Sequence, residues 1–205
     1  MTIARADFPF KGYIVGLIEW FKTSSERTNL NIISYGKDEK VIVDKINALD
    51  DSVKNRISFV GKTDYNELEK YYQNADIYVG MGTTVLDASL RGIVSIPVQA
   101  YTTDLVADKF FFEDYSKVAL DYGSKSSFSK LVERYIRAND TEKTIWSETS
   151  RKAVVDNYGT ESVVDNLIRI LGSAKDNRSS FGMDLLTEYH NIRSELKEKN
   201  YDNGK

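Results

Sequence analysis

The stretch DIYVGMGTTVLDASLRG, residues 76–92, joins a strand-like run to a helix-like segment through a loop with unusual chemistry. The apolar run 77–79 is followed by Gly80, Met and Gly82, then by two threonines, and Asp87 falls on the first turns of the expected helix. Glycines let a backbone approach a ligand closely, and the N–H groups after them can form a nest for an anion. The loop therefore indicates binding as well as a change of direction.

The same loop also has a purely structural interpretation. Thr84 as N-cap and Asp87 at the third helical position would make a capping box, which explains Asp87 but neither Gly80 nor Gly82. The loop is not a Walker loop, because no Gly-Lys-Ser/Thr follows, and Val85 breaks a GxGxxG pattern. In the functional interpretation, Asp87 accepts hydrogen bonds from ribose hydroxyls, as acids near dinucleotide-binding loops do.

Around this stretch, short apolar runs alternate with segments of helical periodicity. The expected strands are residues 3–5, 30–35, 57–61, 76–79, 93–98 and 118–120. The expected helices are residues 12–21, 37–49, 64–74, 128–137, 141–157, 161–171 and 183–199. This alternation predicts βαβ units and a parallel sheet, in which the loops after Arg5, Val60 and Val79 share the carboxyl edge.

Composition narrows the function classes. The chain has 205 residues, of which 41% are hydrophobic and 29% charged, as expected for a globular protein with a core. A net charge of -3 gives no general attraction to nucleic acid. With no cysteine and one histidine, thiolate chemistry and histidine-rich metal sites are excluded. No stretch is long and apolar enough for a membrane helix, and the N-terminus lacks a signal-peptide pattern, so we expect a cytoplasmic protein.

A second constellation lies near the start of the chain. Arg5 leaves the first expected strand, and Lys11 arrives six residues later, where Gly12 opens a helix. Two cations beside a helix N-terminus suit an anion of high charge, such as a diphosphate. The alternative is that Arg5 pairs with Asp7 and Lys11 is merely exposed. Because functional residues begin so close to Met1, we expect the chain to be the C-terminal half of a longer protein.

Taken in order, these segments resemble the C-terminal, nucleotide-sugar-binding half of GT-B glycosyltransferases, in particular the retaining group called family 4. The matching motifs are RADFPFKG, SYG, ISFVG, ELEKYY, the run Asn74-Ala75-Asp76, the pair Asp87-Ala88, Gly92 and Pro97-Val98. The resemblance covers residues 1–100 and returns in the helices of residues 140–171. It implies a Rossmann-like, doubly wound parallel sheet with extra C-terminal helices. We expect this domain over residues 1–172, followed by a linker and an amphipathic helix over 173–205.

The resemblance also implies a role for each group of residues. The donor diphosphate would be bound by Arg5, Lys11, Gly82, Thr83 and Thr84. The ribose would be bound by Asp87, and the base would be contacted by the backbone of Val60, Gly61 and Lys62, although the last three also read as a generic strand end. Catalytic groups and the acceptor site would belong to the missing N-terminal half, and no metal or other cofactor is implied.

Two departures from the family concern the donor sugar. The family has two glutamates separated by seven residues, whereas this chain has Val79 at the first position and the shorter Asp87 at the second. The family's later Gly-Gly…Glu segment has no counterpart in the run YTTDLV that begins at Tyr101. The sugar contact would then fall to Thr83, Thr84 or Asp104.

The sequence thus predicts the donor-binding domain of a glycosyltransferase that uses a nucleotide diphosphate sugar and a glycan or lipid-linked acceptor, in polysaccharide biosynthesis. Its expected partners are the nucleotide-sugar and the missing domain, with no nucleic acid. Peripheral membrane association of the full-length protein stays open. The alternatives are a nucleotide-sugar epimerase of the same fold and a non-enzymatic interaction module that docks through residues 183–199.

Overall fold

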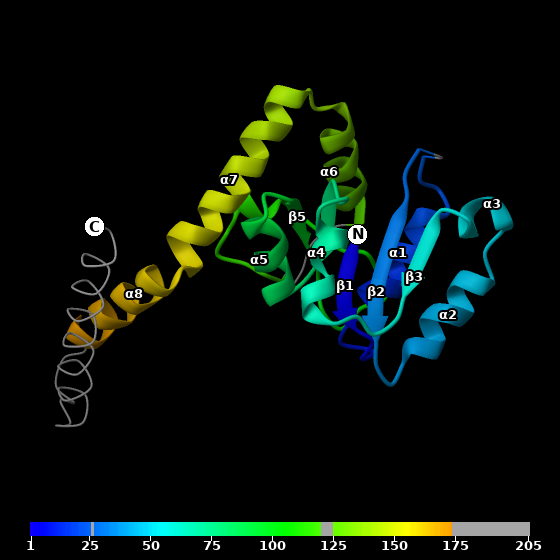
Figure 1. Cartoon of the computed structure of the whole chain (residues 1–205), viewed down its shortest axis with the longest axis horizontal. Helices are drawn as coiled ribbons and strands as arrows, with labels where there is room; N and C mark the ends of the chain where they lie inside the picture. The colour runs from blue at the N-terminus through cyan, green and yellow to red at the C-terminus, as the bar shows by residue number, and fades with distance from the viewer. Residues whose placement is uncertain (26, 120–124, 174–205) are drawn as a thin grey trace. The chain divides into compact units, whose positions relative to one another are not determined.

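The computed structural model describes residues 1–25, 27–119 and 125–173 (Figure 1). The chain separates into two compact units, Met1–Asp156 and Asn157–Lys205. In the second unit, the described residues form the end of α7 (Asp140–Tyr158) and α8 (Thr160–Ser173). The expected linker and helix after residue 173 lie outside the described residues, so the predicted boundary at residue 172 stays a prediction.

The first unit is built on five parallel strands. β1 (Thr2–Arg5), β2 (Leu30–Tyr35) and β3 (Ile57–Val60) form one parallel sheet, and β4 (Ile77–Gly80) pairs with β5 (Val94–Pro97) in another. The two sheets adjoin, because the Val79 N–H donates to the Met1 carbonyl at 2.9 Å and the Met1 amino group donates to the Ile77 carbonyl. The strands therefore follow the order β3-β2-β1-β4-β5. This order confirms the predicted doubly wound sheet.

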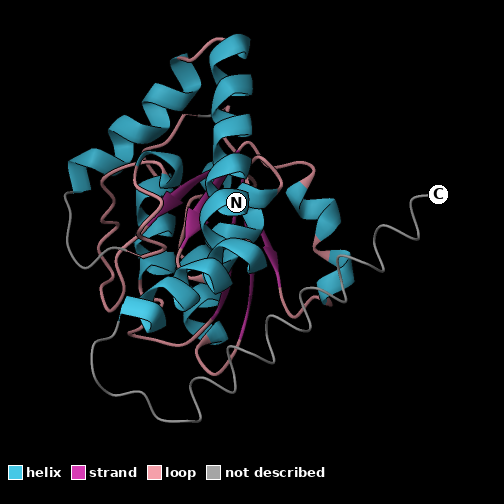
Figure 2. Cartoon of the chain, turned by 90° about the vertical axis from the view of Figure 1, so that its left-hand side faces the viewer, coloured by secondary structure: helices cyan, strands magenta, loops and turns pink. Residues whose placement is uncertain are grey.

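Helices cover the strands of this unit on both faces (Figure 2). The α-helices of the first unit are α1 (Tyr13–Phe21), α2 (Glu39–Asn47), α3 (Asp51–Lys54), α4 (Glu69–Tyr72), α5 (Thr83–Leu90), α6 (Lys125–Arg137) and most of α7. Two short 3₁₀ helices are η1 (Tyr65–Glu67) and η2 (Phe111–Glu113). No helix in the described residues is long and apolar enough to cross a membrane.

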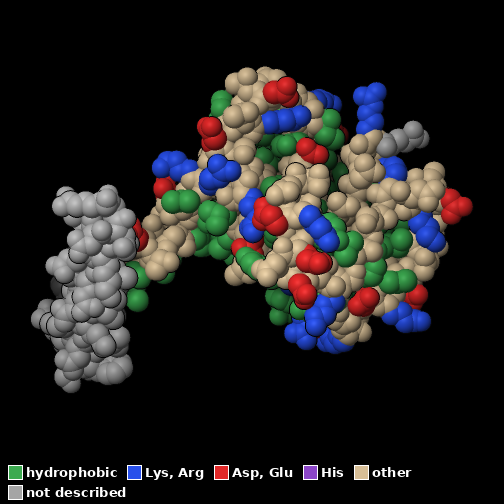
Figure 3. Space-filling model, in the orientation of Figure 1, with side chains coloured by type: hydrophobic (Ala, Val, Ile, Leu, Met, Phe, Trp, Pro, Cys, Tyr) green, Lys and Arg blue, Asp and Glu red, His purple; other side chains and the backbone are tan. Residues whose placement is uncertain are grey.

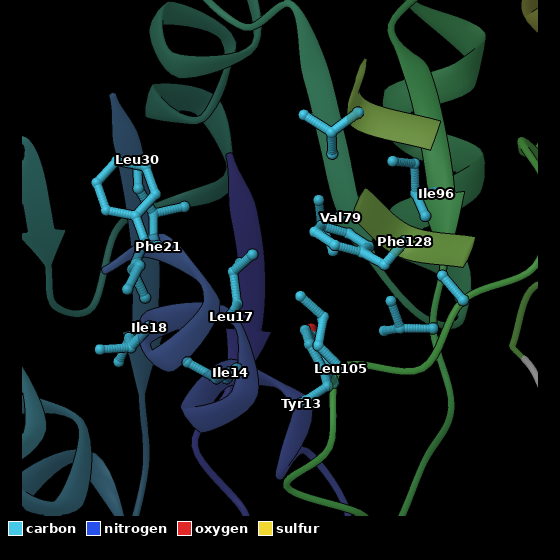
Figure 4. Packing of buried hydrophobic residues seen from close by; sticks show 14 of the residues in the cluster. Tyr13, Ile14, Leu17, Ile18, Phe21, Leu30, Val79, Ile96, Leu105 and Phe128 are labelled. Atoms are coloured by element: carbon cyan, nitrogen blue, oxygen red, sulfur yellow. The ribbon is translucent and has the colours of Figure 1, made fainter. Parts of the chain in front are cut away.

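The core lies between α1 and the strands. Ile14, Leu17, Ile18 and Phe21 recur at helical spacing on one face of α1, and all are at most 2% exposed. Figure 4 shows these side chains beside Leu30, Val79, Ile96, Leu105 and Phe128. A continuous apolar face on α1 holds the loop before it, residues 6–12, at the carboxyl edge of the sheet.

Two expected elements differ in the structure. The single helix expected over residues 64–74 is divided into η1 and α4, because i→i+3 bonds from Glu67 to Asp64 and from Leu68 to Tyr65 tighten its first turn. The strand expected over residues 118–120 is absent at Val118 and Ala119, and residue 120 lies outside the described residues. The run is too short for a ladder, and the Val118 carbonyl instead accepts the Gly82 N–H at 2.7 Å.

Candidate functional site

The strand order creates a topological switch point between β1 and β4. From β1 the chain proceeds to β2 and β3 on one side, and then crosses to β4 and β5 on the other. In open parallel sheets, ligands bind at the carboxyl edge where the strand order reverses. Arg5 ends β1, Lys11 lies in the loop after it, and the loop after β4 carries Gly82. The fold therefore places these two predicted groups at the carboxyl ends of the two strands that flank the switch point.

The predicted base-binding segment lies farther along the same edge. Val60 ends β3, which is separated from β1 by β2, a distance of about 10 Å at the usual strand spacing. Gly61 has open surroundings, since an added Cβ would meet only a Glu39 carboxylate oxygen at 3.8 Å. Lys62 is exposed. An elongated ligand could span from the switch point to this segment.

The loop after β1 is tied to the loop after β2. The Asp7 carboxylate pairs with Lys37 at 2.8 Å, and the Phe8 N–H donates to the Asp38 carboxylate at 2.7 Å. The hydrogen bond from Lys37 lowers the pKa of Asp7. Arg5 is exposed and makes no salt bridge within the described residues; Asp7 makes its salt bridge to Lys37, and the Arg5 charge lowers the pKa of Asp7 further. Arg5 is left at the carboxyl end of β1, beside the switch point, as an available cation.

Lys11 is half-buried rather than merely exposed. Its Nζ lies 4.8 Å from the centre of the Phe10 ring, and burial lowers its pKa. The Lys11 and Gly12 amides donate to the carbonyls of Asp7 and Pro9, so the loop itself uses these N–H groups. An anion at this position would consequently depend on the Lys11 side chain more than on the start of α1.

The loop after β4 is organised by a buried phenol. Tyr78 is fully buried, and its hydroxyl donates to Thr84 Oγ1 at 2.6 Å, while Thr84 Oγ1 donates to the Met81 carbonyl at 3.2 Å. The Ile3 carbonyl of β1 lies 3.0 Å from the same phenol oxygen. A Cβ on Gly80 would come within 2.6 Å of that oxygen, so Gly80 makes room for the tyrosine.

Gly82 is the position that faces outward. Its φ of 77° requires glycine, and an added Cβ would meet nothing within 4 Å. It is the N-cap of α5, and no side chain caps the helix, so the alternative capping box of Thr84 and Asp87 is wrong. The first N–H groups of α5, at Thr83 and Thr84, have no carbonyl in the preceding turn and carry the positive end of the helix dipole.

Asp87 lies in the seam between α4 and α5. Arg91 donates to the Asp87 carbonyl at 2.9 Å, pairs with Glu69 at 2.8 Å and stacks on the Tyr72 ring at 4.5 Å. Burial raises the pKa of Tyr72, and the nearby Asp87 charge raises it further. The Asp87 carboxylate is therefore close to Tyr72, one helical turn beyond Thr84, and its predicted ribose contact stays a prediction.

The packing of the loop over residues 99–105 against α1 was not predicted from the sequence, although Asp104 in this loop was named as a candidate sugar contact. The loop lies on α1 so closely that a Cβ on Gly12 would be 2.5 Å from the Thr102 carbonyl oxygen, and one on Gly16 would be 2.4 Å from that of Thr103. Two glycines four residues apart on one helix face are the signal that could have found this approach. These two glycines allow the loop to pack closely against the start of α1.

The charge on this edge is mixed. Figure 3 shows Lys and Arg side chains gathered along the lower margin of the unit, where the strands of Figure 1 end, with Asp and Glu side chains among them. Exposed cations of the loops and first helical turns at this edge are Arg5, Lys37, Lys40 and Lys62. Within the part of the chain that the structure describes, no cluster of His, Asp and Glu could hold a metal ion.

Comparison with known proteins supports the fold. No family model and no curated protein matches the chain. Among solved structures, the trehalose-6-phosphate phosphatase N-terminal domain of Candida albicans is similar, with a TM-score of 0.59 and 15% identity over 83% of this chain and 41% of that chain. A trehalose-6-phosphate synthase has a TM-score of 0.52 and 11% identity over 82% of this chain and 44% of that chain.

The chain thus spans less than half the length of both proteins. At these identities the likeness concerns the fold alone. The synthase is a GT-B glycosyltransferase, and the present chain has a Rossmann-like fold similar to that of a GT-B glycosyltransferase.

Proposed function

We propose that this chain is the donor-binding domain of a glycosyltransferase related to family 4, which transfers a sugar from a nucleotide diphosphate sugar to a glycan or lipid-linked acceptor. In this proposal the acceptor site and catalytic groups belong to an upstream GT-B domain, and the full-length protein acts in polysaccharide biosynthesis at the cytoplasmic side of a membrane or in the cytoplasm. This chain alone binds the donor and transfers little or no sugar.

The observation that supports the proposal is the topological switch point between β1 and β4. Arg5 and Lys11 stand on its β1 side, and Gly82 with the N-terminus of α5 stands on its β4 side. When the bond between the sugar and the diphosphate breaks, negative charge grows on the departing phosphate. Two cations and a helix dipole stabilise that charge without a metal ion.

The remaining roles follow the edge of the sheet. With the diphosphate at the switch point, the nucleoside extends towards β3, where the open backbone at Gly61 contacts the base. Asp87 reaches the ribose from α5, provided that its carboxylate turns from Tyr72 towards the edge. This orientation of the nucleotide along the sheet edge agrees with the base and ribose contacts that the resemblance implies.

A second candidate is a domain that binds the donor nucleotide without supporting transfer. Val79 stands where family 4 has an acid, and it is 5% exposed within the hydrophobic core beside α1. It therefore offers no hydrogen bond to a sugar hydroxyl, which favours this candidate. Its distinguishing property is diphosphate binding that gains nothing from an attached sugar.

The test is a calorimetric titration of UDP, GDP and ADP into the wild-type chain and into the Arg5→Ala, Lys11→Ala double variant. We expect saturable binding of one diphosphate and at least a tenfold loss of affinity in the variant, because two charge-assisted contacts are removed. The matched control is Lys130→Ala, Arg137→Ala, which removes two positive charges from α6 and should leave the affinity unchanged.

Two results would contradict the proposal. One is the absence of saturable binding for all three diphosphates at millimolar concentration. The other is an equal loss of affinity in both double variants, which would show that net charge, and not the position of Arg5 and Lys11, governs the interaction.

A further inference from the structure

Tyr101 is unusual in its backbone and in its exposure. Its φ is 59°, and no other non-glycine residue in the described part of the chain has a positive φ. Its side chain is 71% exposed. A bulky residue adopts the left-handed region rarely, and such outliers concentrate at functional sites. Packing in the core does not explain the tyrosine here, since most of its ring faces solvent.

The loop that carries Tyr101 is anchored at its base. Val98 forms an antiparallel bridge with Ala107, and the Gln99 N–H donates to the Val106 carbonyl at 3.1 Å. Leu105 is 5% exposed and lies beside Tyr13 in the core (Figure 4). The base of the loop is therefore fixed, and its tip is held at the carboxyl edge.

The ring of Tyr101 is joined to the predicted diphosphate site. The Tyr101 backbone N–H donates to the Phe10 carbonyl at 3.1 Å. The centres of the Tyr101 and Phe10 rings are 5.0 Å apart, with the ring planes tilted by 55°. On the same Phe10 ring, the Lys11 Nζ lies 4.8 Å from the centre. An exposed aromatic surface thus adjoins the cation that is expected to hold a phosphate.

We infer that Tyr101 and Phe10 form a platform on which the sugar ring of the nucleotide-sugar packs. This inference rests on the proposed function. With the nucleoside towards β3 and the diphosphate at the switch point, the sugar extends to the opposite side, where the loop after β5 carries Tyr101. An aromatic ring packs against the C–H face of a sugar, and a tyrosine hydroxyl can bond a sugar hydroxyl at its rim.

The platform would also replace the sugar contact that family 4 makes through an acid and that Val79 cannot make. Family 4 contacts the sugar through an acid at the position of Val79, and Val79 is buried in the core. Recognition through an apolar ring face needs no acid. It favours a sugar with an uninterrupted C–H face over one whose hydroxyls project from both faces.

The test compares each diphosphate with its sugar-bearing form by calorimetry, using UDP with UDP-glucose, GDP with GDP-mannose, and ADP with ADP-glucose. Tyr101→Asn removes the ring and keeps a residue that tolerates the left-handed backbone, whereas Tyr101→Phe keeps the ring. For the preferred base, we expect the sugar to strengthen binding to the wild-type chain. Tyr101→Asn should reduce that gain at least fivefold and leave the affinity for the plain diphosphate unchanged. Tyr101→Phe should keep most of the gain.

The outcomes separate the inference from the function on which it rests. If the diphosphates bind and Tyr101→Asn changes neither affinity, or if the sugar adds nothing to wild-type binding, the platform is wrong and the donor site stands. If no diphosphate binds to the wild-type chain, the proposed function fails and the platform with it. Near-identical amide spectra of the variants outside the loop would show that each is folded.

Discussion

At the scale of single residues, Gly80 at the end of β4 and Gly82 after it are required for different structural reasons. Gly80 is required because a Cβ would contact the buried Tyr78 phenol, whereas Gly82 is required by its own backbone angle. The first requirement depends on a neighbouring side chain, and the second is local. Only Gly82 borders open space, and it is therefore the glycine that a ligand could approach.

Gly82→Ala should destabilise the chain by about 1–2 kcal/mol, because φ of 77° with ψ of -151° is a region that L side chains rarely adopt. The added methyl meets no atom within 4 Å, so backbone strain is the whole cost. Urea unfolding followed by circular dichroism measures the change. Gly61→Ala is the matched control, since Gly61 has no positive φ and only a side-chain oxygen at 3.8 Å, and its effect should stay below about 0.5 kcal/mol. Equal effects of the two substitutions would refute this account of Gly82.

At the scale of elements, the β1 and β5 loops are joined across α1. The carbonyls of Thr102 and Thr103 approach Gly12 and Gly16 too closely for any side chain. This contact fixes the loop that carries Tyr101, and it explains Gly12 without a ligand. The predicted phosphate site therefore shares its first helix with a packing surface.

Gly16→Ala tests that packing, because helix propensity and tertiary contact have opposite effects on the free energy of unfolding. Alanine is favoured over glycine within a helix by about 1 kcal/mol, but its Cβ would stand 2.4 Å from the Thr103 oxygen and 2.9 Å from the Leu105 nitrogen. Both are backbone atoms that cannot rotate away, so we expect a net loss of about 1–3 kcal/mol. Thermal unfolding provides the measurement, with cleavage of the 99–105 loop by a protease as a second readout.

Thr149→Ala on α7 is the control for propensity alone, since Thr149 is exposed, and it should raise stability slightly. An increase in stability for Gly16→Ala as well would mean that the loop can move off α1 at little cost.

At the scale of the whole molecule, the hydrophobic core that the described residues form lies in the first unit. Its buried members run from Ala6 to Val132, and the packed aromatics extend it to Trp146. The strand order within this unit creates the switch point, which no single element could form.

A chain ending at residue 172 should therefore unfold cooperatively, with the same urea midpoint as the full chain and the same diphosphate affinity. A chain ending at residue 127 loses Phe128, Leu131 and Val132 from the core, and it should fail to fold. A lower midpoint for the chain ending at residue 172 would place residues 173–205 in the folding unit and contradict the predicted boundary.

The sequence by itself determined the class of fold and the edge on which the site is expected. Short apolar runs and a periodicity of 3.6 residues are local properties, and they predicted β1 to β5 and the main helices. The glycines at the end of β4 and after it are likewise visible in the sequence, and for that reason Gly80 and Gly82 could be named together as candidates for a ligand-binding backbone. The parallel βαβ pattern then placed Arg5, Lys11 and Gly82 at strand ends.

Only the tertiary structure decided which of these residues are available. Lys37 makes the salt bridge to Asp7, so Arg5 has no salt-bridge partner among the described residues. The close approach of the Thr102 carbonyl requires glycine at position 12, and the Tyr78 phenol requires glycine at position 80. Tyr101 reaches Phe10 from 91 residues away in the chain. Except for the contact of Tyr78 with Gly80 within β4, these contacts join loops that are distant in sequence. The loops meet because parallel strands bring their carboxyl ends to one edge, where packing and charge select partners that no local pattern records.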